Sequence, residues 1–225
     1  MNTDKPVFKK ELPNIYSLRY SNQYDLCMSL VRVQEYYESP EYKGKYFQLE
    51  EFMDYWAREH GEGCFNYPIT WNGFNFPGYI LNLWWKEFAK YSDIRPREQE
   101  LLEIFLSNVP FSEWNKSYFI FVNENDEEME QVLRHEIAHG LYFTNHEYRD
   151  KCNFLLKKVS GLSYNRGSKT ILEMGYHKDV IDDELQAYWS TSDKLIETKS
   201  LRRREAFYKN YEKFIEDYAK KSDTI

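Results

Sequence analysis

One pattern limits the possible folds of this chain more than any other. His135, Glu136 and His139 stand in the spacing H-E-x-x-H. Residues four apart lie on one face of an α-helix about one turn from each other, so a helix lets both imidazoles bind one ion. Glu136 then lies beside the ligands, where its carboxylate can take a proton from a water molecule held by that ion. We therefore expect a metal-binding helix with His135 and His139 as ligands and Glu136 as general base.

The sequence before this pattern predicts a strand followed directly by the helix. The run from Tyr118 to Val122 is aromatic and β-branched, which is typical of a strand. Asn125 can cap the helix, and Glu128, three residues later, completes a capping box.

A catalytic zinc site normally has three protein ligands, so the sequence must supply one more. His146, seven residues after His139, is one candidate, and Glu184 on a later predicted helix is another. His146 requires a sharp turn at Thr144 and Asn145, where the sequence has no glycine to ease it. The residues alone leave both candidates open.

The order of strand, H-E-x-x-H helix and downstream helix with Glu-x-x-Ala resembles the zincin metallopeptidase superfamily, and within it the gluzincins. The resemblance covers residues 117–192 and maps the third ligand onto Glu184, followed by Ala187. It implies that the two helices pack face to face, that Zn²⁺ is the cofactor, and that a substrate peptide pairs with the strand before the metal helix.

The chain also departs from related patterns. Metzincins carry Gly and His where this sequence has Tyr142 and Asn145, which argues against that branch. Thermolysin-like enzymes carry an Asp where Tyr188 stands, so a carboxylate that orients a ligand histidine must come from elsewhere. Asp182 and Asp183 are the candidates.

These features predict a zinc-dependent hydrolase, a metallopeptidase that cleaves peptide bonds in a peptide or protein substrate. The developing oxyanion needs a hydrogen-bond donor, for which Tyr188 and His177 are candidates. Two alternatives stay open: a protein-binding module whose zinc is structural or non-catalytic, and a zinc hydrolase that acts on a non-peptide amide.

The hydrophobic pattern predicts an α+β fold that is mainly helical, with a zincin-like core and a short sheet. We expect an aromatic-rich helical portion over residues 1–110, either a cleft wall or a partner-binding module, and the metal-binding portion over 111–225, together forming one compact body. Within them we expect helices at 47–60, 79–91 and 96–106, a helix or strand at 25–38, a loop at 64–78, and a docking helix at 200–221.

Composition narrows the function further. A net charge of -7 argues against nucleic-acid binding, despite the basic run at 202–204. Three widely spaced cysteines predict free thiols. Residues 1–12 do not resemble a secretory signal, and no apolar window is long enough for a membrane span. We therefore expect a cytoplasmic protein that binds no membrane; export without a cleavable signal and the oligomeric state are left open.

Overall fold

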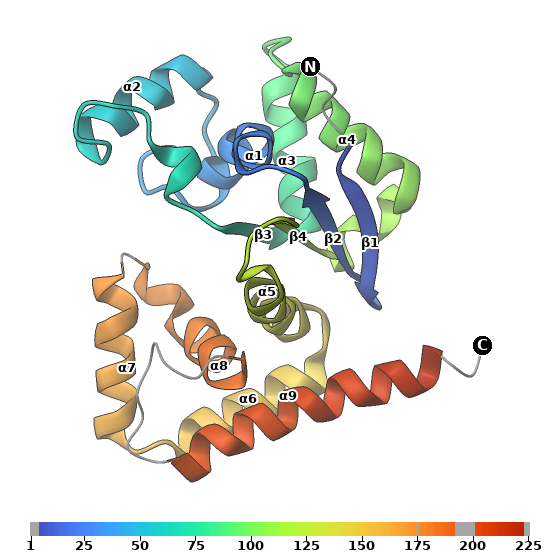
Figure 1. Ribbon diagram of the computed structural model, residues 1–225, viewed down its shortest axis with the longest axis vertical. Coiled ribbons are helices and arrows are strands. Elements are labelled where there is room, and N and C mark those ends of the chain that lie inside the picture. The colour runs from blue at the N-terminus through green and yellow to red at the C-terminus, as the bar shows by residue number, and fades with distance from the viewer. Residues whose placement is uncertain (1–4, 175, 192–200, 223–225) are drawn as a thin grey trace. The chain divides into compact units, whose positions relative to one another are not determined.

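A computed structural model describes residues 5–174, 176–191 and 201–222, the side chains of 201–203, 221 and 222 excepted. The chain forms two compact units, Met1–Val132 and Leu133–Ile225. As predicted, the described part is mainly helical with one small sheet (Figure 1). None of the described helices is long and apolar enough to cross a membrane.

The first unit is built on a mixed sheet of four strands in the order β1-β2-β4-β3. β4 lies between two partners, with β2 parallel on one side and β3 antiparallel on the other. β1 and β2 form a hairpin whose turn has Asn14 in the left-handed region, at φ 62°. The strands are β1 (Val7–Leu12), β2 (Ile15–Tyr20), β3 (Gly73–Pro77) and β4 (Tyr118–Asn123).

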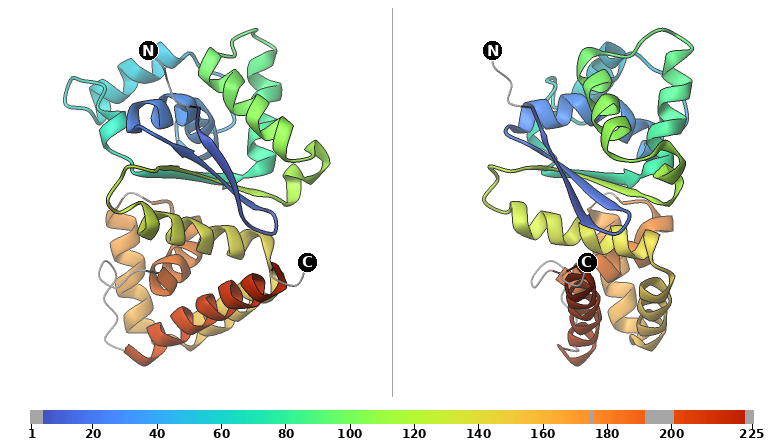
Figure 2. Two further views of the ribbon diagram at one scale, coloured as in Figure 1. Left: turned by 45° about the vertical axis from the view of Figure 1, so that its right-hand side comes forward. Right: turned by 90° about the vertical axis from the view of Figure 1, so that its right-hand side faces the viewer.

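Four helices of the first unit lie on one face of this sheet (Figures 1 and 2). Aromatic rings fill the space between, as the 18% aromatic content requires. Phe105 stacks on Phe119 with ring centroids 4.0 Å apart, and Phe76 lies 4.9 Å from Phe121. The elements are α1 (Gln23–Glu38), α2 (Leu49–Glu59), α3 (Gly78–Ala89), α4 (Pro96–Asn108) and the 3₁₀ helices η1 (Tyr67–Ile69) and η2 (Phe111–Lys116).

The structure corrects three expectations about this region. The segment 64–78, expected as a loop, contains β3. Three of the four strands also lie within residues 1–110, where the sequence predicted a helical portion. The first unit ends after Val132 rather than at residue 110, because β4 is a central strand of its sheet.

The central position of β4 also overturns an expectation about substrate. The resemblance implied that a peptide pairs with this strand. Its backbone edges are already paired with β2 and β3 over residues 118–123 and 118–122 respectively, so β4 has no edge to offer a further strand.

Helix α5 (Met129–Thr144) begins four residues later than Asn125, the predicted cap. Asn125 instead donates to the carbonyl of Ser21 and Asp126 accepts from the backbone N–H of Glu128, so the predicted capping box does not form. In the second unit, α5 is followed by α6 (His146–Lys158), α7 (Gly161–Glu173), the 3₁₀ helix η3 (Lys178–Val180), α8 (Ile181–Thr191) and α9 (Leu201–Ser222).

The C-terminal helix α9 packs on the second unit, as the spacing of its aromatic residues predicts. Phe207 and Tyr211 are each 1% exposed. The Phe207 ring lies 5.3 Å from that of Trp189 on α8, and the Tyr211 hydroxyl donates to the carbonyl of Arg134 on α5. This helix therefore closes the core of the second unit.

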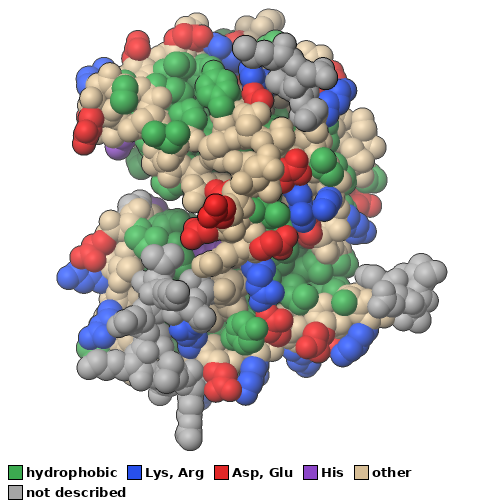
Figure 3. Space-filling view, viewed as in Figure 1, with side chains coloured by type: hydrophobic (Ala, Val, Ile, Leu, Met, Phe, Trp, Pro, Cys, Tyr) green, Lys and Arg blue, Asp and Glu red, His purple; other side chains and the backbone are tan. Residues whose placement is uncertain are grey.

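Charges of both signs are mixed on the face shown in Figure 3, with Lys and Arg lying among Asp and Glu over each unit. Along α9, Lys209 pairs with Glu205 and Lys220 with Glu216. The side chains of Arg202 and Arg203, in the basic run of the sequence, lie outside the described residues.

Candidate metal centre

The two histidines of α5 face one another as the four-residue spacing predicts. Their Nε2 atoms lie 3.1 Å apart, and His139 is 3% exposed. When two nitrogens bind the same tetrahedral zinc ion, each at ~2.0 Å, they lie about 3.3 Å from each other. The observed separation therefore suits a shared ion.

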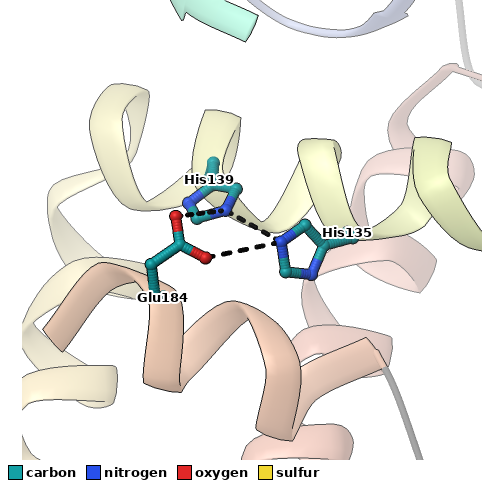
Figure 4. Close-up of side chains that lie close together, drawn as sticks. All are labelled: His135, His139 and Glu184. Carbon is teal, nitrogen blue, oxygen red and sulfur yellow. Dashed lines mark hydrogen bonds and ion pairs between the residues drawn. The ribbon is translucent and has the colours of Figure 1, made fainter. Parts of the chain in front are cut away.

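Glu184 on α8 points toward both imidazoles (Figure 4). Its Oε1 lies 3.6 Å from Nε2 of His139, and its Oε2 lies 3.7 Å from Nε2 of His135. The three residues thus present ligand atoms within 4.8 Å of one another, and no other such group of three occurs among the described residues.

One carboxylate oxygen of Glu184 lacks a hydrogen-bond partner in the described part of the chain, and this bears on whether the site can hold a cation. Oε2 of Glu184 is buried and accepts no hydrogen bond from the described residues. Burying an unpaired carboxylate oxygen costs several kcal/mol unless a cation or donor compensates. Two imidazoles and one carboxylate are also a ligand set of catalytic zinc sites. The residues present therefore fit a divalent cation.

Asp183 lies behind His139 and holds its ring. Oδ1 of Asp183 is 2.9 Å from Nδ1 of His139. In the neutral ring, this contact favours a proton on Nδ1, so that the lone pair is on Nε2, which faces Glu184 and His135. Of the two carboxylates predicted for this role, Asp182 and Asp183, it is Asp183 that contacts the ligand histidine.

The electrostatics of the site favour positive charge. Burial of the ring lowers the pKa of His139, but the carboxylates of Asp183, Glu184 and Glu136 outweigh it and raise this pKa to about 10. Without a metal ion, a proton on His139 supplies the positive charge that the surrounding carboxylates require.

Glu136 is 8% exposed and interacts electrostatically with His139. Its position next to His135 on α5 is the one that the sequence predicts for a general base. A carboxylate beside the metal ligands lies where a general base can reach a water molecule held by the ion.

Tyr188 lies one turn after Glu184 on α8, with its ring 4.5 Å from that of His135. Burial raises the pKa of Tyr188, which keeps its hydroxyl protonated and able to donate. This hydroxyl is hydrogen-bonded to that of Tyr176, and burial likewise raises the pKa of Tyr176. No sequence pattern identifies Tyr176, which lies between α7 and η3.

The remaining two histidines of the prediction lie outside the cluster. His146 is exposed at the start of α6, where Nδ1 contacts Arg149. The chain does turn sharply there without a glycine, because Asn145 caps α6 by accepting from the N–H of Tyr148. His177 is also exposed and caps η3, where Nδ1 accepts from the N–H of Asp179.

Among the described residues the three cysteines are free thiols, as predicted, with Cys27 and Cys152 buried and Cys64 exposed. None of them belongs to the His135, His139 and Glu184 cluster. Comparison with protein-family models, with curated proteins and with solved structures found no match to this chain.

Proposed function

We propose that this chain is a zinc-dependent metallopeptidase of the gluzincin kind. The observation that carries the proposal is the convergence of His135, His139 and Glu184, whose ligand atoms lie within 4.8 Å of one another. Three protein ligands leave a fourth position for water or substrate, which is typical of a catalytic zinc rather than a structural one.

Zinc bound there supplies an activated water molecule and polarises the substrate carbonyl. Glu136 accepts the proton of the attacking water and passes it to the leaving amine, so that the carboxylate is regenerated in each turnover. Its burial beside the ligands supports this role, because a base must lie within hydrogen-bond reach of the proton that it removes.

Tyr188 is the better supported of the two predicted oxyanion donors. Its hydroxyl is hydrogen-bonded to that of Tyr176, and burial raises its pKa, so it stays protonated. The ring lies against His135, while His177 is exposed on η3. A donor that is held by a second hydrogen bond is oriented before the transition state forms, which is how such groups stabilise developing charge.

The peptide substrate rests on the resemblance alone, because β4 has no edge to offer an extended chain. The order of the H-E-x-x-H helix and a later helix with Glu-x-x-Ala supports a gluzincin-like activity on peptide bonds.

Glu136→Gln tests the reaction. We expect the variant to keep its zinc and to lose activity by a factor of about 10²–10⁴, the usual contribution of a general base. Parent and variant are incubated with a cellular proteome, and new protein N-termini are sequenced. Glu130→Gln, an exposed position on the same helix, is the matched control and keeps parent activity.

Two outcomes contradict the proposal in different ways. Equal turnover by the parent and Glu136→Gln eliminates this carboxylate as the base. Tight zinc binding with no new N-termini in any sample favours a non-catalytic protein-binding module instead. Hydrolysis of small non-peptide amides alone favours a zinc hydrolase that acts on such amides.

A further inference from the structure

We propose that Gln186 is a positioning residue of the metal centre, which acts on the ligand His139 through Asp183. The inference rests on the metal site of the proposed function and not on the reaction. Gln186 lies on α8 one turn after Asp183, and its side chain is fully buried. Its amide joins the centre to the interior of the second unit.

One carboxylate oxygen connects Gln186 to the ligand. Oδ1 of Asp183 is 2.9 Å from Nδ1 of His139 and accepts from Nε2 of Gln186 at 3.0 Å. The Asp183 side chain is 32% exposed, so without the amide it could rotate toward solvent. The donor from Gln186 thus restricts this carboxylate to the orientation in which it meets the imidazole.

The same amide also contacts the metal helix. Nε2 of Gln186 donates to the carbonyl of Ala138, the residue before His139, at 3.3 Å. A single NH₂ group therefore ties α8 to both the backbone and the side-chain partner of the ligand. Both donors of the amide are used, which is the full capacity of this group.

The other end of the amide fixes which way it points. Oε1 of Gln186 accepts from the hydroxyl of Tyr148 at 3.0 Å, with the thiol of Cys152 at 3.7 Å. If the amide were reversed, its oxygen would face the Asp183 carboxylate and the Ala138 carbonyl, both of which only accept. The two donors on α6 and the two acceptors near the metal centre therefore select one orientation.

The part of this network around Gln186 is closed to water. Four of its side chains are 0% exposed: Gln186, Tyr148, Cys152 and Ser190. The Tyr148 hydroxyl lies 3.3 Å from that of Ser190. Water cannot reach the carbonyl of Ala138, which is also buried, so removal of the Gln186 amide leaves that acceptor unsatisfied. The buried core of the second unit therefore fixes the orientation of the His139 ring through Gln186 and Asp183.

Zinc affinity tests the role, measured by competition with a chromophoric chelator on the full chain. Gln186→Met keeps the length of the side chain and removes the amide. We expect about tenfold weaker zinc binding, at the lower end of the range for groups that hold a ligand in place. Thr191→Val, on the same helix, is the matched control and keeps parent affinity, because the Thr191 hydroxyl donates within α8 to the carbonyl of Ala187.

A double variant separates a role through Asp183 from a general effect on packing. If Gln186 acts through that carboxylate, Asp183→Ala with Gln186→Met binds zinc no more weakly than Asp183→Ala alone. In the zinc-loaded protein we also expect Gln186→Met to move the hydrogen-bonded Nδ1 proton of His139 upfield in the proton NMR spectrum. A packing effect alone leaves that proton unchanged.

Parent affinity in Gln186→Met, or fully additive losses in the double variant, overturns the inference. If Gln186→Met does not fold, Gln186→Leu also removes the amide and leaves an apolar side chain, and the same tenfold loss is expected. A parent that binds zinc without hydrolysing any substrate contradicts the proposed function and leaves this inference standing. A parent that binds no zinc overturns both.

Discussion

Glu184 and His146 give opposite predictions for the third ligand, and the two can be compared in one experiment. Glu184→Ala removes a carboxylate with both oxygens within 3.7 Å of the histidine nitrogens. We expect it to weaken zinc binding by more than the about 10- to 100-fold that follows loss of a group that merely orients a ligand. His146→Ala removes an exposed ring and is expected to keep its zinc. Metal content after dialysis measures both.

The result contradicts the assignment if only His146→Ala loses zinc. His177→Ala serves as a further control, because this ring is exposed on η3 and contacts Asp179 rather than the cluster. It also tests the second predicted oxyanion donor, because its activity can be compared with that of Tyr188→Phe at equal zinc content.

At the scale of residues, the sequence predicted those roles that depend on local spacing. His135, Glu136 and His139 lie on one helix, so a four-residue interval is enough to bring the two rings together. Glu184 was predicted as the third ligand from the order of the strand and helices along the chain. Gln186 and Tyr176 have no such pattern, because their partners belong to other elements and depend on how the helices pack.

The contact between α1 and η1 predicts a pH dependence at the scale of elements. Glu35 on α1 accepts from the Tyr67 hydroxyl of η1 at 2.8 Å. Burial raises the pKa of Glu35 from 4.5 to about 7, although hydrogen bonds from Tyr67 and Ser39 lower it in part. The folded protein therefore binds this proton more tightly than the unfolded chain does.

The sign of the effect follows from that difference. Glu35 contributes stability that is complete below pH 4.5 and is lost as the pH rises through about 7. Over this window we expect the first unit to lose on the order of 2 kcal/mol of unfolding free energy relative to Glu35→Gln, which still accepts from Tyr67. Denaturant unfolding at several pH values measures it, with the exposed Glu41→Gln as control. Parallel pH profiles of the parent and Glu35→Gln would contradict the assignment.

There are physical reasons why the sequence did not predict strands β1 and β3. β1 is an edge strand with exposed lysines, so it lacks the alternating apolar pattern that identifies a half-buried strand. β3 lies among glycine and proline residues that are typical of loops, and its pairing with β4 joins residues far apart in sequence. In contrast, α2, α3 and α4 carry local helix signals and were predicted within a few residues of their ends.

At the scale of the whole molecule, the division into two units separates the metal centre from most of the aromatic core. All three candidate ligands lie in Leu133–Ile225, as do Asp183 and Gln186. The sequence predicted a boundary near residue 110 because the strand at 118–122 was assigned with the metal helix that follows it. Strand pairing is a long-range property, which local sequence patterns do not reveal.

Zinc should therefore protect one unit and not the other. A ligand that binds only the folded state at a hundred times its dissociation constant stabilises that state by about 2.7 kcal/mol, which slows exchange through global opening about 100-fold. We expect this slowing for amides of α6 and α8, measured by hydrogen exchange and mass spectrometry with zinc and with chelator. Peptides of α1 to α4 act as the internal control and should exchange at one rate in both conditions. Equal protection of both units would mean that the first unit opens only together with the metal-binding unit, and zinc protection that persists in Glu184→Ala would place the ion elsewhere.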